Sequence, residues 1–324
     1  MTSKRRTFLA GLAAATTTLA SARAWAQSFP SKPVRFIVPF AAGGNADVTA
    51  RLVGEGMSRK FGQLVVVDNR PGAGGVVGQE LVLQAPADGY TMVISAFGPL
   101  YVSPLMAGKP SMIPSFAPVG MLSTVPMIVV VPATSRFADW PALLAAAKAK
   151  PGTISYGTPP AAGMGHMAGE ELQRRAGIKL IHAPYRGGAD AARDIGAGAI
   201  DSVIITTNSI RPPVAAGRAR VLAVTSLKRS SAFPNAPTLN ESGYPGFDLA
   251  DWNGMFAATG TPMPVVERMQ AVIAETVKDA KVKERLDPTG ADLVANTPAE
   301  FKTWMAGQRD LLGKLIVEAD IKLQ

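Results

Sequence analysis

The sequence contains no cysteine and only two histidines, His166 and His182. A chain without thiols forms no disulfide, holds no cysteine-ligated zinc or iron–sulfur site, and has no thiolate nucleophile. Two imidazoles also argue against a histidine-rich metal site. The hydrolase motifs G-x-S-x-G and H-E-x-x-H are missing as well. We therefore expect no metal, no cofactor and no catalytic residue.

Residues 1–26 are typical of an export signal. The segment RRTFL stands near the start, and a weakly apolar run follows that ends in Ala-Trp-Ala, a small-x-small cleavage pattern. Paired arginines in this setting indicate a twin-arginine signal, with a plain secretory signal and a membrane anchor as the alternatives. A stable membrane span needs about 20 strongly apolar residues, whereas this run is mostly Ala, Thr and Gly. We expect cleavage after Ala26 and a periplasmic mature protein.

The charge of the mature chain is only mildly positive. Removing the signal removes four basic residues, so the formal net charge falls from +9 to +5. The remaining basic residues are dispersed, without the aromatic-interleaved stripe of a nucleic-acid binder. Such a surface suits small anions through weak steering, and it is equally typical of a merely soluble surface. We expect no nucleic-acid partner.

Short apolar runs alternate with helical patterns along the mature chain. Near-continuous apolar character is typical of strands covered on both faces. The predicted strands are residues 34–40, 64–69, 90–96, 126–132, 153–157, 179–185, 200–206 and 219–226. Between them apolar residues recur at helical spacing, as in Val48, Leu52, Val53 and Met57. This alternation predicts an α/β fold with parallel sheets flanked by helices.

The last quarter of the chain is predominantly helical. Apolar residues repeat at intervals of three and four over residues 266–277, and TPAEF, residues 297–301, is a capping-box sequence that opens a second helix. Two helices with only a short strand over residues 291–295 between them cannot form a domain alone, so we expect them to pack on the N-terminal sheet. The predicted domains are a discontinuous first lobe, residues 27–125 and 251–324, and a second lobe, residues 126–250.

Two glycines, Gly43 and Gly44, stand where the first strand gives way to a helix. Such a junction leaves several backbone N–H groups unpaired and directs them to one spot, with the positive end of the helix dipole behind them. Glycine lets a carboxylate or phosphate approach the main chain closely. The motif G-x-x-x-x-G-K-[ST] is missing, which argues against a nucleotide phosphate. The alternative is a tight turn in which glycine serves only the backbone conformation.

Two further glycine clusters follow predicted strands. Residues 69–78 contain G-x-G-x-x-x-G, a near miss to the dinucleotide fingerprint, and we interpret them as a structural turn because NAD is not available in the periplasm. Residues 155–172 repeat the arrangement of strand, turn and helix, with Thr158 adding a hydroxyl and His166 as a local hydrogen-bonding partner. Two anion-ready helix starts on two lobes predict a cleft that holds a small acid.

From about residue 30 to the end, the chain resembles the substrate-binding proteins of tripartite tricarboxylate transporters, the TctC or Bordetella uptake gene (Bug) family. The resemblance rests on long motifs, among them PFAAGGNADVTAR, VDNRPGAGGVVG, SYGTPPAAGMGHMAGEEL, HAPYRGGADAARDIGAGAID and DLADWNGMFAATGTP. It implies a two-lobed type II periplasmic-binding-protein fold that closes on a hinge, with a helical C-terminus packed on the first lobe. It also implies capture of a carboxylated solute for a membrane permease, without enzymatic activity.

The resemblance implies which residues line the site. In this family the turn after the first strand holds one carboxylate, largely through main-chain amides and ordered waters. The implied ligand-binding residues are Phe40, Ala41, Ala42, Gly43, Gly44, Asp47, Ser95, Ala96, Phe97, Thr158, Ala161, Ala162, Gly163, Tyr185, Thr206 and Thr207. The second-lobe loop departs from the family pattern, since Pro160 and Ala162 replace glycines and Gly163 replaces a serine, which makes this half less polar. Ile205 stands where an acidic residue is common, which argues against an amino acid ligand.

We therefore expect a monomeric periplasmic protein that captures a mono- or dicarboxylate with an aliphatic or aromatic body for a tripartite tricarboxylate-type transporter. Two other classes remain open. A periplasmic hydrolase would act on a carboxylated substrate, and a sensor lobe would use the same cleft to report a bound solute to a membrane partner.

Overall fold

The computed structural model describes residues 29–159, 163–287 and 290–318. The export signal predicted over residues 1–26 and the predicted site residues Ala161 and Ala162 lie outside these ranges. Within the described ranges, no helix combines the length and the apolar character that crossing a membrane requires.

The first lobe is built on a sheet in which β1 (Val34–Val38) lies between β2 (Val65–Asn69) and β3 (Thr91–Ser95), parallel to both. Strand β3 then pairs antiparallel with β9 (Ala250–Ala258), which pairs antiparallel with the long strand β4 (Phe116–Pro132). The connecting helices of this lobe are α2 (Asn45–Phe61), α3 (Val76–Gln84) and the short α4 (Ser103–Met106). Each of β1, β2 and β3 is followed by a helical segment, as the alternating sequence pattern predicts.

The second lobe uses the other end of β4. Residues 127–130 of β4 pair with β7 (Ser202–Thr206), and residues 128–132 pair with β8 (Ala219–Val224). Strand β5 (Ser155–Thr158) lies parallel between β7 and the edge strand β6 (Ile181–Pro184). The helices of this lobe are α5 (Trp140–Ala149), α6 (Met164–Ala176), α7 (Gly188–Ala197) and α8 (Thr207–Ala215).

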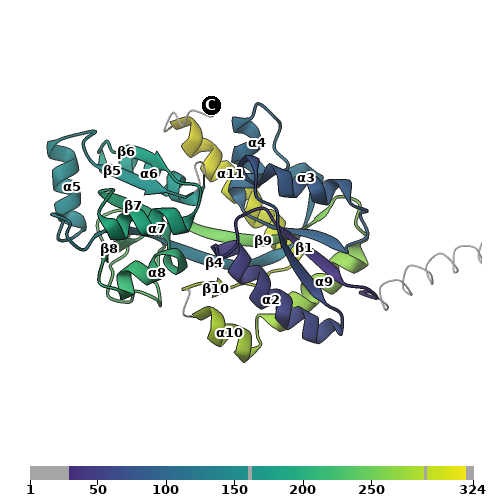
Figure 1. The fold of residues 1–324 in the computed structure, drawn as a ribbon. Coiled ribbons are helices and arrows are strands. Elements are labelled where there is room, and N and C mark those ends of the chain that lie inside the picture. Colours follow the sequence, from purple (N-terminus) through teal and green to yellow (C-terminus); the bar gives the residue numbers. More distant parts are fainter. Residues whose placement is uncertain (1–28, 160–162, 288–289, 319–324) are drawn as a thin grey trace, which may run out of the picture.

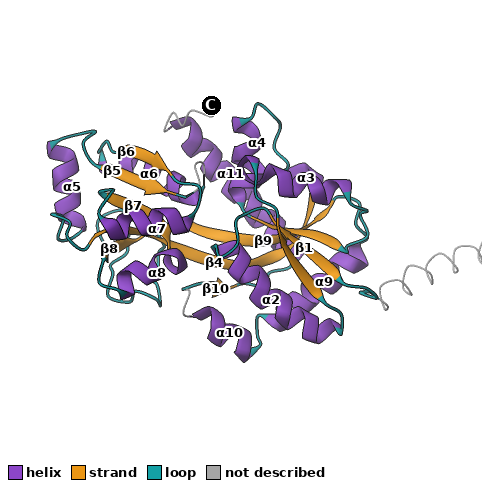
Figure 2. Ribbon diagram, in the orientation of Figure 1, coloured by secondary structure: helices purple, strands orange, loops and turns teal. Residues whose placement is uncertain are grey.

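Strands β4 and β9 connect the two lobes, which lie side by side in Figure 1. The strand order is β2-β1-β3-β9-β4-β7-β5-β6, so β4 takes part in both halves of the sheet. Figure 2 shows these two long strands running through the middle of the molecule while the shorter strands fan out at either end. The chain therefore crosses between lobes twice, and each crossing is a paired strand rather than a free linker.

The C-terminal helices pack on the first lobe, and one of them also contacts the second. They are α9 (Met263–Thr276), α10 (Ala280–Leu286) and α11 (Pro298–Glu318), with the two-residue strand β10 (Asp292–Leu293) paired to β4 before α11. Helix α9 packs on α2 and β4, which confirms the predicted return to the N-terminal sheet. Helix α11 contacts β4 and α9 and also α6 of the second lobe, a contact that the sequence did not predict.

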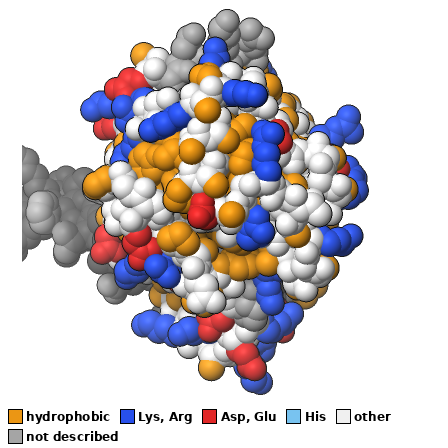
Figure 3. Space-filling model, turned by 90° about the vertical axis from the view of Figure 1, so that its left-hand side faces the viewer, with side chains coloured by type: hydrophobic (Ala, Val, Ile, Leu, Met, Phe, Trp, Pro, Cys, Tyr) orange, Lys and Arg blue, Asp and Glu red, His pale blue; other side chains and the backbone are white. Residues whose placement is uncertain are grey.

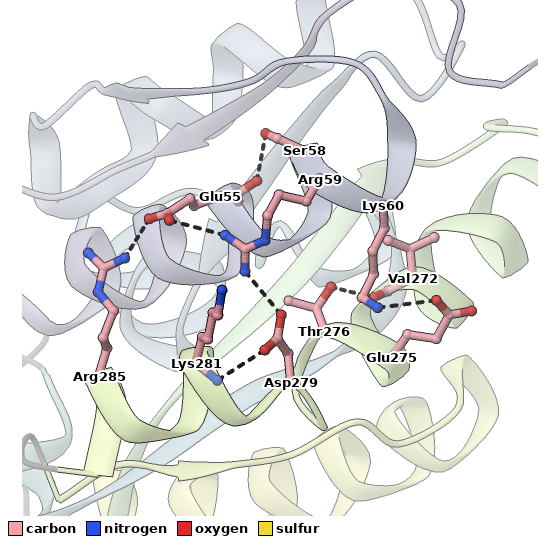
Figure 4. Close-up of polar contacts among 11 residues, drawn as sticks. Glu55, Ser58, Arg59, Lys60, Val272, Glu275, Thr276, Asp279, Lys281 and Arg285 are labelled. Carbon is pink, nitrogen blue, oxygen red and sulfur yellow. Dashed lines mark hydrogen bonds and ion pairs between the residues drawn. The ribbon is translucent and has the colours of Figure 1, made fainter.

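Ion pairs join α2 to α9 and α10, as Figure 4 shows. Arg59 contacts Glu55 on its own helix and Asp279 at the start of α10, at 3.1 and 3.0 Å. Arg285 of α10 contacts Glu55 at 2.6 Å, and Lys60 contacts Glu275 of α9 at 3.5 Å. Exposed pairs of this kind contribute about 0–1 kcal/mol each, so the position of α2 depends mainly on the apolar residues that it buries, such as Val53 and Met57.

Candidate solute-binding site

The turn between β1 and α2 presents backbone N–H groups at the surface. Gly43 has φ +82°, a conformation that favours glycine, whereas Gly44 has φ −77° and ψ 171° as the residue that precedes α2. No side chain caps α2 at Gly44, so the first N–H groups of the helix lack the acceptors that a helix interior provides. Ala41, Ala42 and Gly43 are exposed. The turn is thus accessible and lies at the positive end of the α2 dipole, which are the two properties that the predicted anion site requires.

Asp47 stabilises this turn from within. Its side chain is buried, and its Oδ2 accepts hydrogen bonds from the Gly43 N–H at 2.9 Å and from Arg51 Nε at 3.1 Å. Burial acts to raise the pKa of Asp47, but the hydrogen bonds from Arg51 and Gly43 outweigh it and lower that pKa. Arg51 also donates to Asn69, whose amide donates to the Phe40 carbonyl at 3.2 Å. Asp47 is therefore a positioning residue that fixes the turn while leaving the first N–H groups of α2 uncovered.

Helix α6 begins at a glycine in the same way as α2. Gly163 precedes α6 with φ −77° and ψ 175°, nearly the conformation of Gly44, and again no side chain caps the helix. By contrast, Asp139 and Asp279 cap α5 and α10 with their side chains, and Thr297 and Glu300 form the predicted capping box of α11. The two predicted anion sites thus share a glycine start without a side-chain cap, which α7 also has at Gly187, whereas the starts of α5, α10 and α11 are satisfied by side chains.

A polar network connects β5, β6 and α6. Thr158 is fully buried, and its hydroxyl lies 2.7 Å from His182 Nε2. The His182 ring stacks on His166 with 3.9 Å between ring centroids, and the hydroxyl of Tyr156 donates to Glu170 at 2.5 Å. His166 Nε2 lies 3.6 Å from the same Glu170 oxygen. The two histidines are local hydrogen-bonding partners in this network, and sequence reasoning missed that they stack.

Burial lowers the pKa of His182 to about 4, and the neighbouring His166 acts in the same direction. The unfolded chain takes up a proton near the ordinary histidine pKa of 6.5, so His182 favours the folded state above that pH and loses this contribution as the pH falls towards 4. The shift in pKa corresponds to about 3 kcal/mol of unfolding free energy. Solvent screening reduces this figure, so we expect the free energy of unfolding to fall by about 1–2 kcal/mol between neutral pH and pH 4.5. Urea unfolding of the wild type and His182→Gln at pH 7 and 4.5 measures it. A stability difference between the two proteins that does not change with pH would contradict this assignment.

The other predicted site residues occupy strand ends and lie mostly beneath the surface. Ser95 is fully buried and accepts a hydrogen bond from Gln79 at 3.1 Å, and Phe97 stacks on Tyr101. Ala96 is buried beside them, and Thr206 at the start of α8 is buried with its hydroxyl 3.1 Å from that of Ser209.

The two remaining predicted residues of the second lobe pack against backbone. Thr207 is fully buried against the turn before β10, where a Cβ on Gly290 would lie 2.7 Å from its hydroxyl. Tyr185 is half-buried, its ring covers Gly157, and its N–H donates to the Thr158 carbonyl at 2.9 Å. The structure therefore brings Thr158 and Tyr185 together, while Thr207 contacts the segment after α10.

Ile205 does not influence the polarity of the site. It is fully buried in an apolar cluster with Ile195 of α7 and Ile128 of β4. The argument against an amino acid ligand took Ile205 as a pocket residue and therefore loses its structural basis, because this side chain lies in the core; the ligand class itself stays a prediction.

The glycine cluster of residues 69–78 is a structural turn, as predicted. Gly72, Gly74 and Gly75 all have positive φ, at 141°, 62° and 96°. A Cβ on Gly75 would lie 2.7 Å from Pro99, and one on Gly78 would lie 2.9 Å from both Pro39 and the Arg70 carbonyl. Backbone conformation and close packing thus account for these glycines.

Sequence reasoning also missed Asn45 and Asp251. Asp251 lies on β9 opposite Val125, where the chain crosses between the lobes, and the Asn45 side-chain amide donates to its Oδ2 at 3.4 Å. Burial raises the pKa of Asp251 to about 6, against hydrogen bonds from Trp252 and Asn45. The only signal in the sequence was the acidic residue beside Trp252 in the segment DLADWNGM.

Two cavities lie away from the predicted site residues, although Glu170 of the polar network lines one of them. One, of about 330 Å³, lies between α2 and α10 and is lined by Leu52, Glu55 and Arg285 among others, and the second, of about 350 Å³, lies beside α6 and the end of α11. Neither contains a predicted site residue. Figure 3 shows Lys and Arg side chains spread over one face of the molecule among acidic and apolar ones. This face has no continuous basic stripe.

Two α/β lobes joined by crossing strands are the architecture of a two-lobed solute-binding protein. The chain matches the model of the tripartite tricarboxylate transporter family receptor, TctC, over residues 49–321. It belongs to this family, whose members are binding receptors.

Individual relatives agree with this assignment. The chain is 40% identical over 321 residues to the UPF0065 protein in the tcbD-tcbE intergenic region of Pseudomonas sp. (strain P51), covering 97% of this chain and 94% of that protein. It is 30% identical to the periplasmic binding protein BugD, with a TM-score of 0.78, covering 91% of this chain and 99% of that structure. It is 27% identical to R. palustris Rpa4515, solved with adipate, with a TM-score of 0.82 and coverage of 90% and 98%.

Proposed function

We propose that this protein binds a small mono- or dicarboxylate with an aliphatic or aromatic body in the periplasm and delivers it to a membrane permease of the tripartite tricarboxylate type. The observation that carries the proposal is the pair of helix starts at Gly44 and Gly163, which share one backbone conformation and lack side-chain caps. The family membership and the adipate in the structure of Rpa4515 support a carboxylate as the ligand. Residues 1–26 would export the chain by the twin-arginine route, and the mature protein would act as a monomer.

The two lobes would close on each other about the crossing strands. We place the hinge where β4 and β9 leave the first lobe, so that residues 27–125 and 251–324 move against residues 126–250. Val125 pairs with Asp251 and Pro126 with Ala250 at this point. One carboxylate would be held by the β1–α2 turn, residues 40–47, and the rest of the ligand would contact the second lobe near Thr158, Gly163 and Tyr185.

Thermal unfolding of the mature chain in a panel of acids tests the proposal. The panel contains adipate, succinate, benzoate and phenylacetate, with aspartate, glutamate and inorganic phosphate for comparison. A ligand at 100 times its Kd stabilises by about 2.7 kcal/mol, which for a chain of this size raises Tm by roughly 5 °C. Stabilisation by none of the carboxylates would overturn the function, and stabilisation by aspartate and glutamate alone would overturn the ligand class. NMR spectra of the acids after incubation should show them unchanged, because the protein binds without reacting.

A further inference from the structure

The two histidines of the chain stack beside the start of α6. His166 is the third residue of that helix, in the first turn after Gly163, and His182 lies on β6. The ring planes differ by only 9°, with the centroids 3.9 Å apart. The His166 side chain is 15% exposed, so solvent reaches it. A ligand group at the start of α6 would lie about 5 Å from His166, the length of one helical turn.

Glu170 is the acidic residue that faces this stack. Its Oε1 lies 3.6 Å from His166 Nε2 and accepts hydrogen bonds from the Tyr156 hydroxyl of β5 at 2.5 Å and from the Gln173 amide at 2.9 Å. Burial acts to raise the pKa of Glu170, but hydrogen bonds from His166 and Tyr156 outweigh it and lower that pKa. The stack therefore already has one ionised carboxylate beside it.

His166 is the ring of the stack that can take up a proton at neutral pH. Burial lowers the pKa of His182 to about 4, and the neighbouring His166 acts in the same direction. Two imidazolium ions at this separation would also repel each other. The basic residues of α6, Arg174 and Arg175, lie at its far end, where both contact Glu171, at 2.9 and 2.5 Å. They do not compensate a charge at the start of the helix.

A second ligand carboxylate at the start of α6 would add a negative charge to the one on Glu170. Nearby negative charges favour the protonated form of an imidazole. A proton taken from solvent onto the His166 ring would therefore offset the repulsion between the two carboxylates. A monocarboxylate held at the β1–α2 turn brings no charge to this place and gains nothing from the proton.

We propose that His166 takes up a proton when a dicarboxylate binds with its second carboxylate at the start of α6, so that falling pH favours dicarboxylates over monocarboxylates. The inference rests on the proposed function and assigns a proton-linked specificity residue to the same site. The linkage is reciprocal: because binding adds a proton, a higher proton concentration strengthens binding. If the stack served only to hold β6 on α6, both classes of acid would show one pH dependence.

Asp251 is a second group that titrates near neutral pH, since burial raises its pKa to about 6. The Asn45 amide contacts it at 3.4 Å from the first turn of α2. Both classes of acid would place a carboxylate at that turn, so proton uptake through Asp251 would accompany both alike. A comparison of acids that differ by one carboxylate separates the two sources.

Calorimetric titration of the mature chain with adipate and hexanoate makes this comparison, with terephthalate and benzoate as a second pair. Titrations near pH 7 in bis-Tris and Tris, whose ionisation enthalpies differ, give the number of protons taken up per ligand. We expect about half a proton more for the dicarboxylate of a pair. Its affinity should rise about 5-fold between pH 8 and 6.5, and that of the monocarboxylate less than about 2-fold.

His166→Gln removes the proton acceptor and keeps a polar side chain. It should abolish the extra uptake and lower adipate affinity about 5-fold at pH 6.5, without changing hexanoate affinity. His182→Gln removes the only other imidazole of the chain and should retain the extra uptake. If His166→Gln does not fold, the two histidine ring signals in NMR spectra of the wild type, assigned with His182→Gln, give the answer. Adipate should move the His166 signal towards its protonated position, and hexanoate should not.

The outcomes separate the two proposals. If adipate binds with no more proton uptake than hexanoate, if the extra uptake persists in His166→Gln, or if only monocarboxylates bind, the proton linkage is wrong and the proposed function stands. If hexanoate does not bind, the difference in uptake between the wild type and His166→Gln with adipate decides. If no acid binds to the wild type, the proposed function itself fails.

Discussion

Replacing Gly44 by valine is expected to weaken carboxylate binding by about 100-fold or more while the fold remains intact. Gly44 has φ −77°, which any residue adopts, and a Cβ there would meet only the Ala41 carbonyl oxygen, at an ordinary 3.5 Å. The folded protein therefore does not need glycine at this position. The branched side chain would instead occupy the space through which an anion approaches the first N–H groups of α2. Loss of those charge-assisted hydrogen bonds accounts for about 3 kcal/mol, which equals 100-fold in affinity.

Calorimetric titration of the acid that stabilises the wild type most would measure this loss. Gly307→Val is the matched control, because Gly307 is exposed on α11 and a Cβ added there would have no atom within 4 Å. It should bind like the wild type, and both variants should have Tm values within a few degrees of it. Gly43→Val is not a suitable alternative, since φ +82° would strain any other residue. Wild-type affinity in Gly44→Val would remove the β1–α2 turn from the binding site.

The sequence predicted most of the sheet because strands such as β1, β3 and β7 are almost entirely buried and keep their apolar character. All eight predicted strands are present within a few residues, for example β2 at 65–69 and β7 at 202–206. The exceptions are the crossing strands. Residues 116–125 belong to β4 and residues 250–258 form β9, and neither was predicted as a strand. Their sequences are interrupted by Gly, Pro, Ser, Thr and Asn, among them Gly254, which packs against the Phe301 ring, and Asn253, which donates to Ser123.

The two glycine helix starts of the candidate site were predictable from the sequence. Glycine between a strand and a helix indicates a helix start, and the structure places Gly44 and Gly163 at two such starts. Side-chain roles were less accessible, because they depend on contacts between distant segments. Asp47 faces inward to Gly43, and Asp251 meets Asn45 across 206 positions of sequence. Ile205 was misjudged for the same reason, since strand periodicity alone does not tell which face meets a ligand.

Truncation of Trp252 to alanine is expected to destabilise the protein by about 4 kcal/mol, in the range that large-to-small changes of buried aromatic residues produce. Trp252 is 1% exposed and lies on β9 directly beside Asp251. Its ring packs edge-to-face on Phe301 and Trp304 of α11, with centroids 5.7 and 5.3 Å apart. Helix α11 contacts both β4 and α6, so this aromatic cluster joins the crossing strand to the helix that touches both lobes.

Urea unfolding of Trp252→Ala, followed by circular dichroism, would measure the loss, with Trp304→Ala as the control because Trp304 is only half-buried and should cost about 1–2 kcal/mol. Within the described residues the indole N–H of Trp252 has no hydrogen-bond partner. Trp252→Phe keeps most of the ring contacts and removes this unsatisfied donor, so it should cost clearly less than the alanine variant. If Trp252→Ala unfolds within about 1 kcal/mol of the wild type, the cluster does not hold α11 on the crossing strand, and α11 would have to be held by its other contacts with β4 and α6.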